Sequence, residues 1–465
     1  MSQNYDVVVI GAGMSGLAAA IRVALAGKSV LVVEKHDAPG GLNSFYRQEG
    51  RVFDVGLHAL TNYAEKGQKR APLNKIFRQL RIPREAFDLN PQVGSRIRFP
   101  EASLRFTNDP ASLESEIAAN FPDCLEGYRN VVRFVEERDA TALEDRGEMA
   151  GSFLAQHLPD PLLREMLLCP ILYYGSATED DLDLDQFVIL FRSLFLEGFS
   201  RPVDGVRTII RALLKKLKEV GGDRRMNCGV ARIVTRDDRV EEIELDSGEL
   251  IRAGSVLSSA GLVETNRLCG LNDPGDRVGR LSFVETISVY KENPGNFGWN
   301  DTITFFSTRR PFRYRRPEDE LVDPGSGVIC IPNHYQYGGG RSLKEGLVRL
   351  TALANFDQWK ALPKEEYQER KADWFERLQQ VAREVLPTPT KDPRQSLVAR
   401  DMFTPLTVEK YTSHLGGAVY GSSHKAKDGR TDFDNLYLCG TDQGFLGIVG
   451  AMLSGISIAN RYVVA

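Results

Sequence analysis

The feature that most constrains the fold is a glycine turn between two short apolar segments near the N-terminus. The turn reads Gly11-Ala12-Gly13-Met14-Ser15-Gly16, the segments are 7–10 and 30–33, and Glu34 ends the second. Gly11 permits a tight turn, Gly13 lets the backbone approach a pyrophosphate, and Gly16 lets the next helix pack on the sheet. The N–H groups at the start of that helix face the phosphate charge, and Glu34 can accept a hydrogen bond from a ribose hydroxyl. The pattern predicts a strand–turn–helix–strand unit that binds a dinucleotide.

Length and composition indicate a globular chain with more than one structural unit. The chain has 465 residues, of which 42% are hydrophobic and 26% charged, and a net charge of −4. This length exceeds one ordinary domain, and the charge gives no reason to expect nucleic acid as a partner. The six cysteines are scattered without metal-ligand spacing, so we expect reduced thiols and no metal site. The sequence carries no signal for an oligomeric state.

Two regions interrupt the dinucleotide-binding elements. Residues 107–170 show helical spacing of apolar residues, and 282–291, 302–307, 327–332 and 347–355 read as strands before a long helix at 364–386. Between them lie an amphipathic helix at 206–219 and a strand pair at 229–234 and 240–245. We therefore expect an α/β fold: a Rossmann-type domain of residues 1–100, 200–280 and 395–465, interleaved with a mixed α+β substrate domain of residues 101–199 and 281–394.

Two further glycine motifs favour FAD over a nicotinamide cofactor. Gly40-Gly41-Leu42-Asn43 follows Glu34 and can form a small anion-binding concavity. Near the C-terminus, a short strand leads into Gly440-Thr441-Asp442 and then into a glycine loop and helix that begin Gly447-Ile448-Val449-Gly450-Ala451. A helix start offers a positive dipole end. Such a distant element serves a flavin, whose ring becomes negative at one edge on reduction, and has no use in an enzyme that binds only a nicotinamide.

The three motifs, in this order and spacing, resemble the FAD-binding superfamily of amine oxidases, phytoene desaturases, carotenoid isomerases and Rab GDP-dissociation inhibitors. The resemblance implies that the first glycine turn and Gly40–Asn43 contact the pyrophosphate and nearby flavin atoms, and that Glu34 binds the ribose. It also implies that the Val230 backbone contacts the adenine, that Asp442 holds ribityl or phosphate oxygens, and that residues 448–451 lie at the ring edge. The full set of expected FAD contacts is Gly11, Ala12, Gly13, Met14, Ser15, Gly16, Glu34, Lys35, Gly40, Gly41, Leu42, Asn43, Val230, Gly440, Asp442, Gly447, Ile448, Val449 and Ala451. The sequence departs from the family at Leu42-Asn43, where a basic residue is common.

Segments 404–411 and 416–421 resemble the desaturase and carotenoid-isomerase branch, which includes retinol saturase-like proteins. Glu285 falls where many amine oxidases carry a lysine, which argues against amine oxidation. The resemblance implies an FAD-dependent oxidoreductase that exchanges hydride at flavin N5 with a long apolar isoprenoid or polyene. Two alternatives stay open: a flavin oxidase acting on an amine or a smaller hydrophobic molecule, and a non-catalytic protein like the GDP-dissociation inhibitors.

His58 and Tyr420 are the catalytic candidates. His58 follows the turn at 54–56, which this superfamily places near the flavin, and its imidazole can act as an acid or a base or serve packing alone. Tyr420 can line the substrate channel or fill core, and Tyr173-Tyr174 raises the same two alternatives.

The expected partner is an apolar small molecule, and a membrane surface is an open alternative. The apolar stretch 187–199 reads as a buried helix, a wall of the substrate cavity or a membrane-contacting patch. The arginine cluster at 309–316 reads as a solvated loop or a site for anionic lipid headgroups. No stretch reaches about 18 uncharged apolar residues, and the N-terminus enters a core strand directly, which leaves no room for a signal peptide. We expect a cytoplasmic protein, with peripheral contact to the inner face of a membrane as the alternative.

Overall fold

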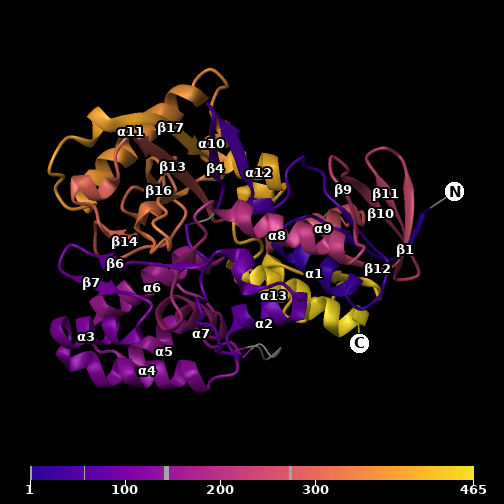
Figure 1. Ribbon diagram of the computed structural model, residues 1–465, viewed down its shortest axis with the longest axis horizontal. Helices are drawn as coiled ribbons and strands as arrows, with labels where there is room; N and C mark the ends of the chain where they lie inside the picture. The colour runs from indigo at the N-terminus through magenta and orange to yellow at the C-terminus, as the bar shows by residue number, and fades with distance from the viewer. Residues whose placement is uncertain (1–2, 57, 141–145, 272–274, 465) are drawn as a thin grey trace.

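A computed structural model describes residues 3–56, 58–140, 146–271 and 275–464, and it arranges them as two lobes, each built around a sheet (Figure 1). The first sheet runs in the order β10-β11-β12-β1-β2-β9, with β18 also beside β12. β1 is parallel to both β2 and β12, as a dinucleotide-binding unit requires. The strands are β1 (Gln3–Ile10), β2 (Val30–Val33), β9 (Asp223–Arg225), β10 (Val230–Arg236), β11 (Arg239–Leu245), β12 (Leu250–Ser258) and β18 (Leu436–Leu438).

Helices from both ends of the chain cover one face of this sheet. They are α1 (Met14–Ala24), α2 (Pro72–Leu80), α8 (Val206–Glu219) and α13 (Gly447–Ala459). α1 and α13 lie side by side, and a Cβ at Gly455 would stand 2.0 Å from the backbone oxygen of Ser15 (Figure 1). Only glycine allows this approach, so the packing of α13 fixes its N-terminus beside the first glycine turn.

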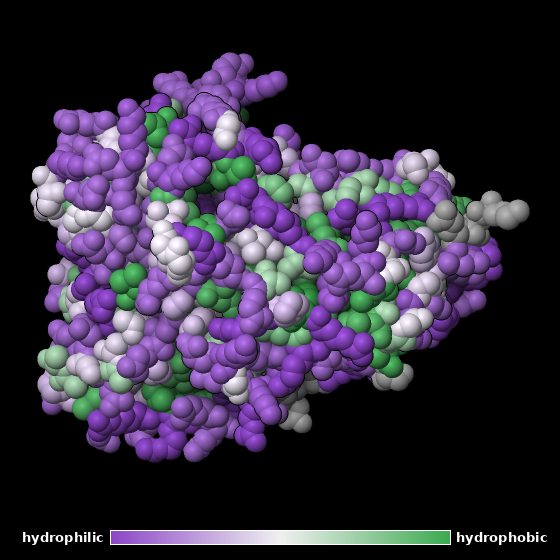
Figure 2. Space-filling model, in the orientation of Figure 1, coloured by the Kyte–Doolittle hydropathy of each residue, from purple (hydrophilic) through white to green (hydrophobic). Residues whose placement is uncertain are grey.

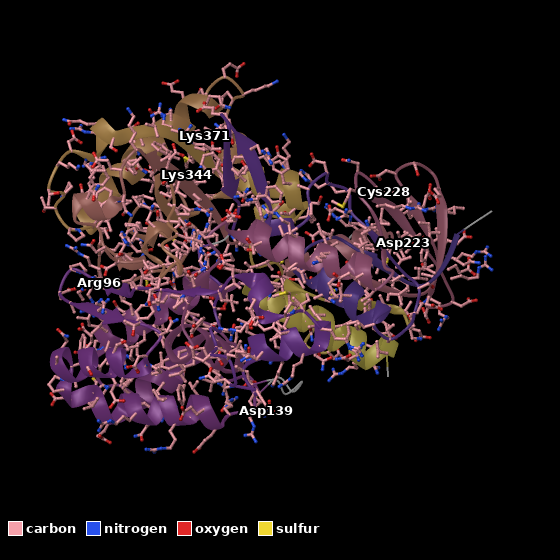
Figure 3. All side chains as sticks on the ribbon, viewed as in Figure 1. Arg96, Asp139, Asp223, Cys228, Lys344 and Lys371 are labelled. Atoms are coloured by element: carbon pink, nitrogen blue, oxygen red, sulfur yellow. The ribbon has the colours of Figure 1, made fainter. Side chains whose placement is uncertain are left out.

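The second sheet forms the other lobe and runs in the order β17-β13-β16-β15-β14-β6-β7. β13 lies between β16 and β17, antiparallel to both, and all nine of its residues are buried. The strands are β6 (Ser95–Arg98), β7 (Ser103–Phe106), β13 (Ser282–Tyr290), β14 (Ile303–Ser307), β15 (Ser326–Cys330), β16 (Gly346–Ala354) and β17 (Leu397–Phe403). Arg96, Lys344 and Lys371 mark this lobe in Figure 3, and Asp223 and Cys228 mark the first.

Helices cover both faces of the second sheet. One face packs against α3 (Pro110–Asn120), α4 (Leu125–Glu137), α5 (Ala150–His157), α6 (Pro161–Gly175) and α7 (Leu184–Phe191). The other face packs against α10 (Phe356–Ala361) and α11 (Tyr367–Val385). α7 continues directly into a π-helical segment, Arg192–Leu196.

Shorter elements join the lobes. β3 (Phe45–Gln48) pairs with β4 (Arg51–Asp54), and β5 (Asn90–Pro91) pairs with β8 (Ser200–Arg201). α9 (Leu262–Leu268) follows β12, and α12 (Pro405–Thr412) contacts both β13 and the turn Gly41–Asn43. α12 therefore lies where the two lobes meet.

The α/β fold class is confirmed, and the domain division stays a prediction. Two strands fall outside the ranges expected for the second domain: β6 and β17 lie in 1–100 and 395–465, yet both pair in the second sheet. Their alternation of apolar and polar residues predicts a strand but not which sheet it joins.

The segment 187–199 is largely buried and forms part of a cavity wall, and membrane contact by this segment stays a hypothesis. Phe187, Phe191 and Phe195 are buried in the helical core, whereas Ile189 and Leu190 line the cavity between the lobes. Hydrophilic residues cover most of the face shown in Figure 2, and hydrophobic residues reach it in small groups.

Four of the five arginines in the cluster at 309–316 are paired with acids. Arg309 pairs with Asp323, Arg310 with Glu165, Arg315 with Asp180 and Arg316 with Asp357. One helical stretch, Gly447–Val464, is long and apolar enough to cross a membrane by length and composition. It is 56% buried and packs on α1, as the core helix of a globular domain does.

Candidate active site

A cavity of about 1510 Å³ lies between the lobes and brings together segments that are far apart in the sequence. One part of its lining comes from the turn after β1, the start of α13 and β10. Another part comes from α6, β13 and β16 of the second lobe. A site in this cavity therefore takes residues from both sheets.

The first glycine turn is shaped by backbone packing and opens onto the cavity. Gly11 has φ +97°, and a Cβ at Gly16 would stand 2.0 Å from the Gly11 oxygen. A Cβ at Gly13 would meet no atom within 4 Å, and Gly13, Met14 and Ser15 all line the cavity. α1 begins at this point with no side-chain cap, so its first N–H groups are available to an anion.

The second glycine motif lies against the first. The Gly40 N–H donates to the Ala12 oxygen at 2.9 Å, and Gly40 has φ +115°. Gly40, Gly41, Leu42 and Asn43 all line the cavity. Glycine is needed at position 40 because a side chain would meet the backbone of Asn43 and Ser44.

Glu34 holds the turn and reaches the cavity as well. Its carboxylate accepts hydrogen bonds from the Ala12 N–H at 2.7 Å and the His36 N–H at 2.9 Å. Both oxygens keep further acceptor capacity for a ribose hydroxyl. Lys35 and Val230 line the same part of the cavity. Their contacts with a cofactor stay predictions.

The residues of the C-terminal motif divide between the cavity and the core. Gly440, Gly447, Ile448 and Ala451 line the cavity, and α13 begins without a side-chain cap. Val449 instead points into the core and is fully buried. A helix presents different faces to cavity and core, so the Val449 side chain points away from the cavity that its neighbours line. A contact of Val449 with the cofactor stays a prediction.

The Asp442 side chain is engaged within the protein. Its carboxylate accepts the Leu262 N–H at 2.6 Å and the Ser422 N–H at 2.8 Å, and Lys425 lies 3.5 Å away. It is 3% exposed and is not among the residues that line the cavity. Its side chain thus ties α9 and the segment after Tyr420 to the glycine loop, and the expected contact of Asp442 with ribityl or phosphate oxygens stays a prediction.

The first glycine turn and the starts of α1 and α13 are suited to bind FAD. The open space beside Gly13 and the uncapped start of α1 suit a pyrophosphate. The uncapped start of α13 lies on the same cavity and suits a ring edge that becomes negative. The start of α1 would hold the central pyrophosphate of the cofactor, and the start of α13 would lie at its flavin ring.

His58 belongs to a buried ionic cluster in the second lobe. Its Nε2 atom lies 3.5 Å from Glu285 Oε1 and 3.2 Å from Thr351 Oγ1. Glu285 also accepts a hydrogen bond from Arg349, which donates in addition to the Val55 oxygen at 2.6 Å. Burial raises the pKa of Glu285, but Arg349 and His58 outweigh burial and the net pKa lies below its ordinary value. Glu285 is therefore an anion that orients the His58 ring at the cavity surface.

Four aromatic residues line the cavity near this cluster: Tyr173, Tyr174, Phe283 and Tyr420. Tyr420 donates its hydroxyl proton to the Tyr173 backbone oxygen and packs edge-on against Phe283 at 5.9 Å. Burial raises the pKa of both Tyr420 and Tyr174, so both hydroxyls stay protonated. The Tyr174 hydroxyl is buried and has no hydrogen-bond partner among the described residues.

Sequence reasoning missed Arg349 and Thr351, although a signal was present. Arg349 interrupts a strand that is otherwise almost wholly apolar, and a buried arginine requires an acid. Glu285 interrupts another apolar strand in the same way. Pairing the two charges would have predicted that β13 and β16 are neighbours. Asn62 and Glu197 were also missed, and neither lies in a recognisable motif.

Comparison with known proteins identifies the family. The profile described as flavin containing amine oxidoreductase matches residues 14–462. Prolycopene isomerase 1 from an Oncidium hybrid cultivar is 25% identical over 99% of this chain and 84% of its own length. The neurosporene-forming phytoene desaturase of Cereibacter sphaeroides is 30% identical over 58% of this chain and 55% of its own length.

A solved structure shows the same fold. The crystal structure of an oxidoreductase from Methanosarcina mazei superposes with a TM-score of 0.67 at 16% identity, covering 98% of this chain and all of the other. Together with the family match, which spans both lobes, this likeness accounts for the interleaved architecture. The chain belongs to the flavin-containing amine oxidoreductase family and is an FAD-dependent oxidoreductase.

Proposed function

We propose that the substrate is a long apolar polyene or isoprenoid, which is desaturated, saturated or isomerised. The observation that carries the proposal is the aromatic and aliphatic lining of the cavity around His58, including Tyr174, Leu190 and Phe283. The similarity to a prolycopene isomerase and a phytoene desaturase supports it. An apolar ligand in such a cavity would lie against apolar side chains, whereas the polar groups of a small polar ligand would lack hydrogen-bond partners there. The lining therefore favours a hydrocarbon over a small polar molecule.

The protein contributes alignment, exclusion of water and a group that can carry a proton. When bound, FAD supplies hydride exchange with a carbon next to a double bond. The aromatic side chains hold the apolar chain and keep water out. His58 Nε2 can hold or give up a proton at the cavity surface, because Glu285 and Thr351 orient its ring. Glu285 is fixed in turn by Arg349.

Amine oxidation is the alternative that the site supports least. The β13 position expected to carry a lysine in amine oxidases holds Glu285, whose carboxylate is already paired with Arg349. A paired carboxylate provides neither the ammonium nor an open anionic site for a cationic amine. The GDP-dissociation-inhibitor alternative is disfavoured by the family match and by the two open helix starts on one cavity.

The test has two stages. The purified protein should show the visible absorption of bound FAD, and its anaerobic bleaching should then be compared between polyenes and amines of matched length. We expect a polyene to bleach the flavin and amines to leave it oxidised. Bleaching by amines alone would overturn the proposed substrate class, and a colourless protein that takes up no FAD would overturn the enzyme assignment itself.

We further propose that the protein works in the cytoplasm, at the inner face of a membrane. A polyene dissolves in a bilayer rather than in water, so the enzyme has to meet it there. Arg70, Lys75 and Arg461 are exposed and line the cavity, which suits contact with anionic headgroups. Flotation with anionic liposomes should recover the protein in the lipid fraction at low salt. Failure to float at any salt concentration would overturn the membrane proposal and leave the substrate proposal standing.

A further inference from the structure

Two backbone irregularities meet at one polar contact on the cavity wall. Glu197 directly follows the π-helical segment Arg192–Leu196, and Asn62 adopts a left-handed conformation with φ +60°. Both conformations are uncommon and occur preferentially at functional sites. The two segments are held together by backbone hydrogen bonds from Asn62 to Ser193 at 3.2 Å and from Tyr63 to Gly198 at 3.2 Å. The fold thus places two polar side chains at one point.

The contact leaves one carboxyl oxygen open. Asn62 Nδ2 donates to Glu197 Oε2 at 2.7 Å, and Thr61 Oγ1 donates to Asn62 Oδ1 at 2.9 Å. Glu197 Oε1 makes no hydrogen bond to any residue that the structure describes. Both Asn62 and Glu197 line the cavity. The open oxygen is therefore available to a ligand.

The surroundings of Glu197 are apolar on one side and cationic on the other. Ile189, Leu190 and Leu196 line the cavity beside it. Burial raises the pKa of Glu197 to about 7, although Asn62, Arg192 and Lys75 act to lower it. Near neutral pH the carboxyl group exists in both forms, so it can accept a hydrogen bond from a hydroxyl or donate one to a carbonyl. The cations Arg192 and Lys75 disfavour an ammonium ligand at this point.

We propose that Asn62 and Glu197 form a polar subsite that binds a hydroxyl or carbonyl group at one end of an otherwise apolar polyene. The inference rests on the proposed function and deepens it: the ligand is an oxygenated polyene rather than a pure hydrocarbon. The oxygen group would occupy the open side of Glu197 while the chain lies along the aromatic wall.

The experiment compares binding of matched ligands to the purified, FAD-loaded protein. A linear polyene, its terminal alcohol and its terminal amine, all of one chain length, are titrated without turnover, and dissociation constants come from the shift of the polyene absorption band. We expect the alcohol to bind about tenfold more tightly than the hydrocarbon, as one buried hydrogen bond allows. The ratio of the hydrocarbon to the alcohol dissociation constant should fall toward one in Glu197→Leu and Asn62→Ala. In Glu197→Gln this ratio should be largely retained.

Glu137→Leu, at an exposed position on α4, is the matched control and should keep the wild-type preference. Equal affinity for alcohol and hydrocarbon in the wild type, tighter binding of the amine, or an unchanged preference in Glu197→Leu would each overturn the subsite. Binding is measured apart from flavin bleaching, so the two proposals fail separately. If the alcohol preference is present but no polyene bleaches the flavin, the subsite stands and the proposed reaction falls.

Discussion

The two walls of the cavity are built in opposite ways. The wall expected to hold FAD is made largely of backbone: glycines at tight turns and helix starts without caps. The wall across the cavity is made of side chains, with His58, Glu285 and Arg349 drawn from three distant segments. A backbone site recognises phosphate through local geometry, whereas the ionic cluster depends on how strands pair. Substitutions that add a side chain to a glycine should therefore damage the first wall most. Substitutions that remove a charged side chain should damage the second wall most.

Arg349→Leu should have the largest effect, because it leaves the buried Glu285 without its main cation. We expect the free energy of unfolding at pH 7 to fall by about 3–5 kcal/mol. In the wild type the pKa of Glu285 is lowered, so its ionised form stabilises the fold above the ordinary pKa. That contribution is lost as the pH falls through the lowered pKa.

Urea unfolding at pH 7 and pH 4 measures this effect. The loss in Arg349→Leu should be smaller at pH 4, where Glu285 can become neutral in the variant. Arg232→Leu, which removes an exposed partner of Glu244, is the control and should change stability little. An equally small change in the free energy of unfolding of both variants would show that the second wall does not depend on its buried charges.

His58→Ala tests whether the ionic cluster acts in the reaction. We expect kcat to fall by about 100-fold, the usual effect of losing a general acid or base. FAD content should be unchanged, because the His58 side chain bonds to Glu285 and Thr351 and to no described residue of the glycine turns. Steady-state turnover with the bleaching polyene provides the measurement, and Thr351→Val should give a smaller loss through ring orientation. An unchanged kcat in His58→Ala would mean that His58 serves packing and takes no part in proton transfer.

Gly16→Ala and Gly13→Ala separate folding from cofactor binding on the backbone wall. The added Cβ at Gly16 would stand 2.0 Å from the Gly11 oxygen, so we expect the FAD-free protein to lose about 1–3 kcal/mol of stability. The Cβ at Gly13 meets no protein atom within 4 Å, so the FAD-free protein should unfold as the wild type does. Its methyl group would enter the space expected for the pyrophosphate and weaken FAD binding by about tenfold or more. Thermal unfolding with and without FAD measures both, and identical behaviour of the two variants would refute this assignment.

The smallest effect is expected for the pair of variants Tyr173→Phe and Tyr174→Phe. Tyr173 loses its 2.9 Å hydrogen bond to Ser326, so its variant should be less stable by about 1 kcal/mol. The Tyr174 hydroxyl has no partner among the described residues, so removing it should leave stability equal or slightly higher. Urea unfolding of both variants measures the difference. Equal destabilisation of the two would show that the Tyr174 hydroxyl makes a stabilising contact.

Local sequence patterns predicted the backbone wall because its geometry is local. The turn at 11–16, the glycines at 40–41 and the start of α13 each carry their own spacing, and all open onto the cavity. Predictions about side chains at the same motifs were weaker. Asp442 bonds to N–H groups 20 and 180 residues away, and no local pattern indicates that its carboxylate is already engaged.

The side-chain wall was predictable only in part. His58, Tyr420 and Glu285 were singled out and all line the cavity, but the sequence did not join them to one another. Their contact depends on β13 lying beside β16, with Glu285 opposite Thr351 in the register. Strand order within a sheet is a long-range property, which explains why Arg349 and Thr351 were missed and why the sequence did not indicate that β6 and β17 pair in the second sheet.

The packing of α13 against α1 also has a consequence for how the protein is made. The first turn leaves the ribosome early, but its partner helix at Gly447–Ala459 is synthesised hundreds of residues later. β17, which completes the second sheet, is also late. The nascent chain therefore carries an apolar α1 without its final neighbour until α13 has been synthesised. The two helix starts expected to contact FAD come together only at that point, so the complete cofactor site is one of the last features of the fold to form.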